Sequence, residues 1–287
     1  MCTGSVEKMK IIEDINEMHH YAMQLRHEGK AIGFVPTMGA LHEGHLSLMR
    51  QAREASEHVV VSTFVNPAQF GPKEDYKEYP RDPRGDTGMT RTADVDTLFT
   101  PPPSAIYPEG YRTYVEVEGL SGVMCGRTRP GHFRGVATIV LKLFNIVRPH
   151  KAFFGQKDYQ QTVIIRRMTK DLHLGVDVMV LPTVREADGL AMSSRNQYLS
   201  PEERRSAAIL YRSLQEAHSR FDKGEHSAEK LREVIIEVLK GESSVQLEYA
   251  VIAHPETLEE VREAGQGTVI AIAAQIGRTR LIDNILL

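Results

Sequence analysis

Residues 31–45 read AIGFVPTMGALHEGH, and this segment is the strongest structural signal in the chain. Its apolar beginning predicts a buried strand, and the Pro and Gly that follow predict a loop. Apolar side chains then recur at helical spacing over residues 46–55, and a β-branched run at 59–65 predicts a second strand. The segment therefore reads as a strand–helix–strand unit, which is typical of a parallel sheet.

The alternation of strand and helix continues to residue 181. Further strands are expected at 96–99, 113–117, 151–154 and 176–181, and helices at 12–25, 133–145 and 161–172. Strands that alternate with helices pack as a parallel sheet with helices on both faces. We therefore predict an α/β fold, a doubly wound parallel sheet of Rossmann-like type, over residues 1–181.

A change in the sequence pattern predicts a second domain over residues 182–287. Ser200, Pro201 and Glu203 have the spacing of a helix start, because Ser caps the helix, Pro suits its first position and Glu closes a capping box. Another helix is expected at 227–239, and β-rich runs follow at 245–252, 268–276 and 279–285. This pattern predicts a smaller α+β domain, which we expect to act as a lid.

Composition and charge limit the classes of partner. The chain has 287 residues, with 35 Lys and Arg against 38 Asp and Glu and a formal net charge of −3. This lacks the basic excess typical of proteins that bind nucleic acid or an anionic membrane through charge, so neither partner is expected. The most apolar stretch, 136–147, is shorter than the roughly 20 residues of a membrane helix. The first ten residues hold no apolar run of signal-peptide length, so we expect a cytoplasmic protein that binds small molecules.

Two histidines, His42 and His45, stand at the predicted start of the helix after the first strand. In a doubly wound fold the ligand binds at the carboxyl ends of the strands, and the first amides of a helix favour phosphate. Gly39 lets the backbone come close to a ligand. Because the histidines are three residues apart, both imidazoles share one face of the first turn and can donate to phosphate oxygens. H-x-G-H after a strand is typical of enzymes that transfer a nucleotidyl group.

Two alternatives to a phosphate site stay open for these histidines. A zinc pair is one, although HEGH is one residue shorter than HExxH and no third ligand stands nearby in sequence. The two cysteines, Cys2 and Cys125, form no CxxC pair, so they support neither a thiolate zinc site nor a disulfide framework. The other alternative is a plain helix cap with two exposed histidines.

A second polar cluster, FGQKDYQQ at 154–161, also follows a predicted strand and should reach the same edge of the sheet. Lys157 can neutralise phosphate, Asp158 can accept from a ribose hydroxyl, and Gln161 can both donate and accept. A Lys–Asp pair taken alone is more often a surface ion pair.

A third cluster, LAMSSRN at 190–196, lies in the polar loop at the expected domain junction. Its two hydroxyls and the Arg195 guanidinium could bind a triphosphate. A plain linker is the alternative. A fourth cluster, RPGHFRG at 129–135, is a basic turn that opens a helix.

Seven stretches of the sequence together resemble one known family. They are PTMGALHEGH (36–45), FVNPAQFGPKEDY (64–76), YPR (79–81), RPGHFRGVAT (129–138), GQKDYQQ (155–161), LAMSSRN (190–196) and GRTRLIDN (277–284). In this combination the chain resembles the pantoate–β-alanine ligase (pantothenate synthetase) family of the nucleotidylyltransferase superfamily. The resemblance implies that ATP activates pantoate as pantoyl adenylate with loss of pyrophosphate, and that the amine of β-alanine then displaces AMP. It also implies Mg²⁺ with the ATP, and a homodimer.

The resemblance implies roles for individual residues. The catalytic residues would be His45, His42, Lys157 and Arg195, with His45 donating a proton to the developing phosphate charge. The ATP site would be formed by Met38, Gly39, Ala40, Leu41, His42, Glu43, Gly44, His45, Gly155, Gln156, Lys157, Asp158, Val184, Met192, Ser193, Ser194 and Arg195. Within that site, the phosphates would be held by Lys157, Ser193, Ser194 and Arg195, the ribose by Gly155 and Asp158, and the adenine by the backbones of Val184 and Met192. Gln69 and Gln161 would bind the hydroxyls and carboxylate of pantoate.

One segment departs from the family pattern. After YPR the family continues as an acidic helix, whereas residues 82–88, DPRGDTG, read as turn-rich here. Asp86 is the expected magnesium ligand, because Mg²⁺ on phosphates needs only one or two protein carboxylates.

Two rival functions stay open from sequence. One is another nucleotidylyltransferase with a different acceptor, against which Gln69 and Gln161 count. The other is a nucleotide-binding regulator without turnover, against which His45, Lys157 and Arg195 count.

Overall fold

The computed structural model describes residues 9–72 and 74–287, which form two compact units. Unit 1 contains the described residues up to Val117 together with Gly131–Gly155 and Ile165–Leu181. Unit 2 contains Glu118–Pro130, Gln156–Ile164 and Pro182–Leu287. The chain passes between the units after residues 117, 130, 155, 164 and 181. Pro182, where the sequence predicts a second domain, begins the longest segment of unit 2.

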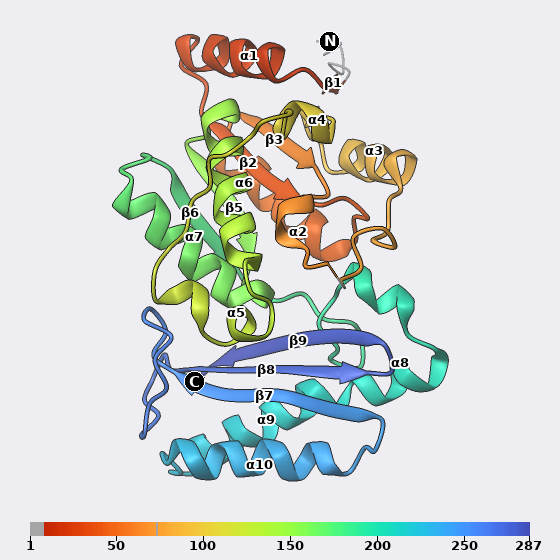
Figure 1. The fold of residues 1–287 in the computed structure, drawn as a ribbon, viewed down its shortest axis with the longest axis vertical. Coiled ribbons are helices and arrows are strands. Elements are labelled where there is room, and N and C mark those ends of the chain that lie inside the picture. Colours follow the sequence, from red (N-terminus) through yellow and green to blue (C-terminus); the bar gives the residue numbers. More distant parts are fainter. Residues whose placement is uncertain (1–8, 73) are drawn as a thin grey trace, which may run out of the picture. The chain divides into compact units, whose positions relative to one another are not determined.

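Unit 1 is built on a parallel sheet, of which β2, β3, β5 and β6 are labelled in Figure 1. Its described strands follow the order β1-β4-β3-β2-β5-β6. The strands are β1 (Lys10–Ile12), β2 (Ile32–Thr37), β3 (His58–Thr63), β4 (Thr97–Phe99), β5 (Lys151–Gly155) and β6 (Asp177–Leu181). On β2, Gly33 is in register with Val59 of β3 on one side and with Lys151 of β5 on the other. The strand order changes direction between β2 and β5, so the loops after these strands flank the usual ligand position of a doubly wound sheet. The predicted doubly wound sheet is confirmed.

Helices cover both faces of this sheet because successive side chains of a strand point to opposite sides. The helices are α1 (Ile15–His27), α2 (Glu43–Ala55), α3 (Pro83–Thr92), α4 (Pro103–Ile106) and α6 (His132–Val147), and α7 (Tyr159–Asp171) follows β5. On β2, Phe34 contacts Phe144 of α6, with ring centroids 6.5 Å apart. The next residue, Val35, packs with Leu48 and Met49 of α2. Packing against β2 therefore fixes α2 directly after the carboxyl end of that strand.

Two sequence expectations for unit 1 are wrong. Residues 113–117 form no strand, and Val115 N donates to Thr138 Oγ1 of α6 at 2.9 Å instead of to a neighbouring strand. The alternating pattern arises because this segment runs beside a helix. Ile12, expected within the first helix, ends β1, and α1 begins after Asp14, whose side chain accepts from Glu17 N at 2.8 Å.

The turn-rich reading of residues 82–88 is also wrong, because α3 starts there. Asp82 is the N-cap and accepts from Gly85 N at 2.9 Å, and Pro83 takes the first helical position. An Asp–Pro pair is itself a helix-start signal, and it outweighs the two glycines that follow. Asp86 therefore lies in the first turn of a helix.

Unit 2 contains a three-stranded antiparallel sheet in the order β7-β8-β9. Its strands are β7 (Val245–Ala253), β8 (Val269–Ile276) and β9 (Thr279–Leu286), and its helices include α5 (Cys125–Thr128), α8 (Pro201–Ala207), α9 (Ile209–Asp222) and α10 (Ala228–Lys240). The predicted capping box is present at α8, where Ser200 Oγ accepts from Glu203 N at 3.2 Å. Leu214 of α9, Ile235 of α10 and Ile272 of β8 share one buried apolar cluster. The predicted small α+β domain is confirmed, and across the described residues no helix could cross a bilayer.

Candidate functional site

The loop between β2 and α2 has a constrained backbone. Gly39 has φ +79° and Ala40 has φ +50°, which is the left-handed region. A Cβ atom at residue 39 would lie 2.8 Å from Asp86 Oδ2, so only glycine fits there without displacing that carboxylate. Thr37 Oγ1 accepts from Gly39 N at 3.1 Å and donates to Ser62 O at 2.8 Å, which ties the loop to β3.

Asp86 of α3 holds this loop from the side. Its Oδ2 accepts from Ala40 N at 3.1 Å and its Oδ1 accepts from Leu41 N at 2.8 Å. The carboxyl group is only 5% exposed, and this burial raises the pKa of Asp86 although the two amides oppose the rise. The carboxylate therefore fixes the conformation of the loop that leads to His42.

The two histidines cap the first turn of α2. The Nδ1 of His42 accepts from Gly44 N at 3.2 Å, and the Nδ1 of His45 accepts from His42 N at 3.3 Å. A main-chain N–H can only donate, so each Nδ1 is unprotonated and each neutral ring carries its proton on Nε2. The ring centroids lie 4.1 Å apart. The capping bonds thus make both histidines Nε2–H donors, which is the chemistry that phosphate oxygens require.

Gln69 approaches the same loop from the short 3₁₀ helix η1 (Pro67–Gln69) after β3. Its Nε2 lies 3.1 Å from the sulphur of Met38, the first residue after β2. The main-chain oxygen of Gln69 is 2.8 Å from His132 Nδ1, at the start of α6. Two residues that the sequence predicts for different substrates, Met38 and Gln69, are therefore neighbours in unit 1.

The predicted residues at the carboxyl end of β5 lie partly in unit 2. Gly155 ends β5, and Gln156, Lys157 and Asp158 form the 3₁₀ helix η3 (Gln156–Asp158). Asn284 of β9 holds this helix: its Nδ2 donates to Gln156 O at 3.0 Å and to Lys157 O at 2.9 Å. Its Oδ1 accepts from Gln156 Nε2 at 3.2 Å. The C-terminal strand thus fixes the backbone that carries Lys157.

A buried ion pair lies next to Asn284. Asp283 is 2% exposed, and its two oxygens accept from Arg185 Nη1 at 2.6 Å and Nη2 at 2.9 Å. The Arg185 guanidinium lies 3.7 Å from the centroid of the Tyr211 ring. This two-bond ion pair stabilises β9 next to Asn284, the residue that holds η3.

The segment that carries the predicted serines and Arg195 is ordered by its own hydrogen bonds. Met192 N donates to Val184 O at 3.0 Å, so the two residues expected to bind adenine are main-chain neighbours. Ser193 caps the 3₁₀ helix η4 (Ser194–Tyr198) and accepts from Arg195 N at 3.3 Å. Asn196 Nδ2 donates to Ala191 O at 3.2 Å. These bonds give the segment a defined conformation, unlike that of a flexible linker.

The predicted residues therefore group as follows. Those in unit 1 are Met38, Gly39, Ala40, Leu41, His42, Glu43, Gly44, His45, Gln69, Asp86 and Gly155. Those in unit 2 are Gln156, Lys157, Asp158, Gln161, Val184, Met192, Ser193, Ser194 and Arg195. Sequence reasoning missed Asn284, although it lies within the stretch GRTRLIDN that carries part of the family resemblance. It also missed that Asp86 binds the loop amides.

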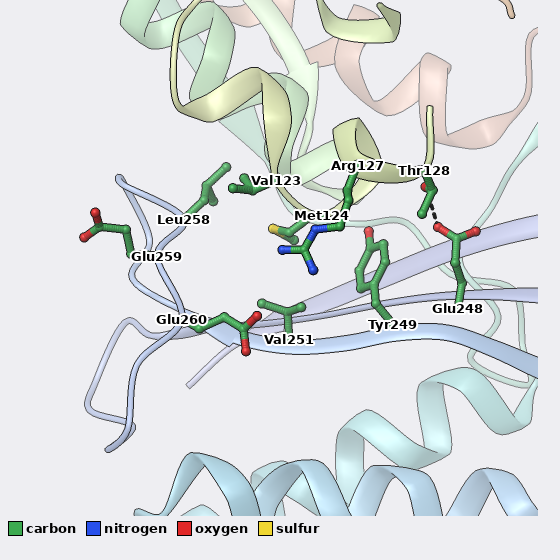
Figure 2. Close-up of a pocket in the computed structure, with 10 residues that line it drawn as sticks. All are labelled: Val123, Met124, Arg127, Thr128, Glu248, Tyr249, Val251, Leu258, Glu259 and Glu260. Atoms are coloured by element: carbon green, nitrogen blue, oxygen red, sulfur yellow. Dashed lines mark hydrogen bonds between the residues drawn. The ribbon is translucent and has the colours of Figure 1, made fainter. Parts of the chain in front are cut away.

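A cavity of about 330 Å³ lies within unit 2, between α5 and the sheet (Figure 2). Thr128 donates to Glu248 Oε1 at 2.6 Å, and Arg280 Nη2 lies 2.7 Å from the same oxygen. The hydroxyl of Tyr249 is 2.9 Å from Cys125 Sγ. None of the predicted site residues lines this cavity, so it does not bear on the roles predicted for them.

Comparison with known proteins gives the same family over nearly the whole chain. The family model for pantoate–β-alanine ligase matches residues 10–286. The pantothenate synthetase of Acetivibrio thermocellus is 51% identical over 278 residues, which cover 97% of this chain and 99% of that protein. The pantothenate synthetase of Thermotoga petrophila is 53% identical over 279 residues, 97% of this chain and 100% of that protein.

Solved structures agree with this assignment. A crystal structure of pantothenate synthetase from Thermus thermophilus has a TM-score of 0.92 and 44% identity, covering 96% of this chain and 99% of that one. The pantoate–β-alanine ligase from Francisella tularensis, crystallised with β-γ ATP and β-alanine, has a TM-score of 0.79 and 34% identity, covering 97% of both chains. On the family model, these relatives and the fold, the chain belongs to the pantoate–β-alanine ligase family.

Proposed function

We propose that this chain joins pantoate to β-alanine at the expense of ATP, through a pantoyl-adenylate intermediate. The observation that carries the proposal is the pair of Nε2–H donors at the start of α2, after the strand where a doubly wound sheet binds its ligand. The ligand pair named for the Francisella tularensis enzyme, an ATP compound and β-alanine, supports the same substrates here.

In the first step a carboxylate oxygen of pantoate attacks the α-phosphorus of ATP. A new P–O bond forms, the bond to the bridging oxygen breaks, and its electron pair leaves on pyrophosphate. His45 donates from Nε2–H to the phosphate oxygens as charge develops there, and His42 supports it. Lys157 and Arg195 would supply positive charge to the phosphates, together with the hydroxyls of Ser193 and Ser194. Orientation of the reactants can supply about 7–11 kcal/mol in well-positioned systems, so no covalent enzyme intermediate is required.

In the second step the uncharged amine of β-alanine attacks the acyl carbon of the adenylate. A C–N bond forms, the C–O bond to the phosphate breaks, AMP leaves with the electron pair, and the nitrogen gives its proton to solvent. Gln69 and Gln161 would hold the pantoyl group during both steps. Gly155 and Asp158 would hold the ribose, and the backbones of Val184 and Met192 the adenine.

Magnesium is expected with the ATP, where it would neutralise phosphate charge. Among residues 9–72 and 74–287 no three His, Cys, Asp or Glu side chains are grouped to hold a metal. A protein-built magnesium cage therefore does not fit these residues. The predicted ligand Asp86 fits a magnesium ion poorly, because it is buried and both of its oxygens already accept from loop amides.

Two further properties are proposed: a homodimer, which the family resemblance implies, and a cytoplasmic location, which is expected because the first ten residues hold no apolar run of signal-peptide length. Analytical ultracentrifugation tests the dimer, and fractionation of the source cells followed by immunoblotting tests the location.

The experiment that tests the reaction is exchange of labelled pyrophosphate into ATP, with pantoate present and β-alanine absent. Adenylate formation predicts exchange that depends on pantoate. If folded protein with Mg²⁺ binds ATP but gives no exchange, a nucleotide-binding regulator without turnover is the better description. If another acid supports exchange and pantoate does not, the chain is a nucleotidylyltransferase with a different acceptor.

A further inference from the structure

The side-chain amide of Asn66 lies at the centre of a hydrogen-bond chain in unit 1. Asn66 is 1% exposed and caps η1. Its Oδ1 accepts from Tyr107 Oη at 2.7 Å and from Ala68 N at 3.3 Å. Its Nδ2 donates to Gln69 Oε1 at 3.0 Å and to Gly135 O at 3.1 Å. All four positions around this amide are therefore satisfied by the protein.

The direction of these bonds is fixed by the backbone. Ala68 N–H can only donate and Gly135 O can only accept, so reversing the Asn66 amide would set donor against donor and acceptor against acceptor. Asn66 consequently presents an N–H to Gln69, and the Gln69 amide turns its oxygen toward Asn66. The Nε2 of Gln69 then faces the sulphur of Met38, beside the loop that leads to the two histidines.

Tyr107 provides the shorter of the two bonds to Asn66 Oδ1. Its ring packs near Phe64, with centroids 6.3 Å apart, and near Tyr111, with centroids 5.0 Å apart. Burial raises the pKa of the Tyr107 hydroxyl well above its usual value, so the phenol stays protonated and remains a donor at physiological pH. The longer bond from Ala68 N is left to hold the oxygen alone if the phenol is removed.

We infer that Tyr107, acting through Asn66, is a positioning residue for Gln69. The backbone sets the direction of the Asn66 amide, and the Tyr107 hydroxyl holds that amide in place so that Gln69 stays aligned as a hydrogen-bond donor to an acceptor oxygen of pantoate. This inference rests on the proposed function, in which Gln69 binds pantoate. A carboxylate offers only acceptor oxygens, and the sulphur that Gln69 Nε2 now faces is a weak acceptor that a substrate oxygen can replace at little cost.

The matched variants are Tyr107→Phe and Tyr111→Phe, because each removes one hydroxyl from neighbouring rings of the same stack. The Tyr111 ring contacts the rings of Tyr107 and Tyr114 and its centroid lies 4.1 Å from Lys142 Nζ, and each of these contacts is made by the ring, which phenylalanine keeps. Tyr107→Phe should raise the KM for pantoate about 3- to 10-fold, the range of one buried hydrogen bond, and leave the KM for ATP unchanged. Tyr111→Phe should change neither constant. An equal rise of both KM values in Tyr107→Phe, or an equal effect of both variants, overturns the inference.

The polarity of Gln69 is tested by Gln69→Glu against Gln69→Ala. A glutamate at this position offers only acceptors to the substrate, so it should raise the KM for pantoate further than alanine does. A Gln69→Glu variant that binds pantoate as well as wild type would show that residue 69 accepts from the substrate, and would overturn the inference.

Side-chain amide signals in ¹⁵N-resolved NMR spectra give a readout that does not need pantoate. Tyr107→Phe should shift the NH₂ signals of Asn66 and Gln69, and Tyr111→Phe should leave both in place. Unshifted signals overturn the inference, and so do shifted signals with an unchanged KM for pantoate. Wild-type protein without pantoate-dependent exchange would instead refute the proposed function, and the NMR result would still show whether the Tyr107 hydroxyl holds the two amides in place.

Discussion

Asn284 Nδ2 lies 2.9 Å from the carbonyl oxygen of Lys157, a residue 127 positions earlier in the chain. The amide is 2% exposed and also donates to Gln156 O, so the last strand determines the shape of the turn that carries the predicted phosphate-binding lysine.

Asn284→Asp should therefore weaken the use of ATP as a substrate, measured as a higher KM for ATP. The carboxylate keeps the size of the amide but loses both donors and places its oxygens against two carbonyl oxygens, at a cost of about 1–3 kcal/mol for each unsatisfied buried group. We expect the KM for ATP to rise about 10-fold or more, with the KM for pantoate unchanged. Steady-state kinetics with each substrate varied in turn measures this, and Asn145→Asp, at an exposed position of α6, is the control. A folded Asn284→Asp enzyme with a normal KM for ATP would contradict the positioning role.

Gly39→Ala should reduce activity more than stability explains. Gly39 and Gly29 both have positive φ, +79° and +76°, so alanine at either costs about 1–2 kcal/mol of backbone strain. Only the Cβ at residue 39 meets a neighbour, Asp86 Oδ2, whereas nothing lies within 4 Å of the Cβ at residue 29. Both variants should lower Tm, and Gly39→Ala the more of the two because its Cβ displaces Asp86. Only Gly39→Ala should slow pyrophosphate exchange, by at least about 10-fold if one oriented donor of the loop is lost. Equal exchange rates in the two variants would argue against the loop geometry as the cause.

His45→Gln and His45→Ala should separate capping from catalysis. Glutamine at this position can still accept from the amide of His42, as in a capping box, while alanine cannot. Both variants lack the imidazole, and a glutamine amide cannot pass a proton to the developing phosphate charge, so both should lower kcat for adenylation by about 100-fold or more. Only His45→Ala should also lower Tm. Wild-type exchange rates in His45→Gln would show that the imidazole does not act on the phosphates.

His150 should make the stability of the fold depend on pH. Its Nδ1 accepts from Ile32 N at 2.9 Å at the start of β2. Burial, and then the Arg26 guanidinium, lower the pKa of His150 below 6.5, against a smaller opposing effect of Glu57. Because the folded-state pKa is the lower one, the unfolded chain binds the proton first as pH falls. The contribution of neutral His150 to the free energy of unfolding is complete above pH 6.5, and it is lost as pH falls through the folded-state pKa.

The measurement is Tm between pH 8 and pH 5 for wild type and His150→Asn, whose Oδ1 can accept the same bond. The wild-type Tm should fall more steeply, and His20→Asn, at an exposed position of α1, should follow wild type. Parallel curves for wild type and His150→Asn would assign the pH dependence to other groups.

Local signals predicted the strand, loop and helix at residues 31–45 because hydrophobic pattern, turn residues and capping agree there. The interactions that complete the site are long-range. Asp86 and the loop amides are separated by 45 and 46 positions, and Asn284 and η3 by 127 and 128, so no periodicity connects them. The strand predicted at 113–117 was wrong because of its local pattern. An alternating pattern fits a strand, but it fits an extended segment beside α6 equally well. The pair Asp82–Pro83 is a helix-start signal, but the two glycines that follow led to the wrong prediction of a turn.

Asn284 also matters for when the turn at Lys157 can form during translation, because the ribosome makes residue 157 long before residue 284. Lys157 leaves the tunnel well before residue 284, so throughout the later part of translation the phosphate turn lacks the amide that holds it. A chain that stops before β9 contains every histidine, lysine and arginine of the predicted chemistry. It still lacks the Asn284 amide that holds the turn at Lys157. The turn at Lys157 can therefore take its folded shape only after Asn284 of β9 has been made, 127 residues later in the chain.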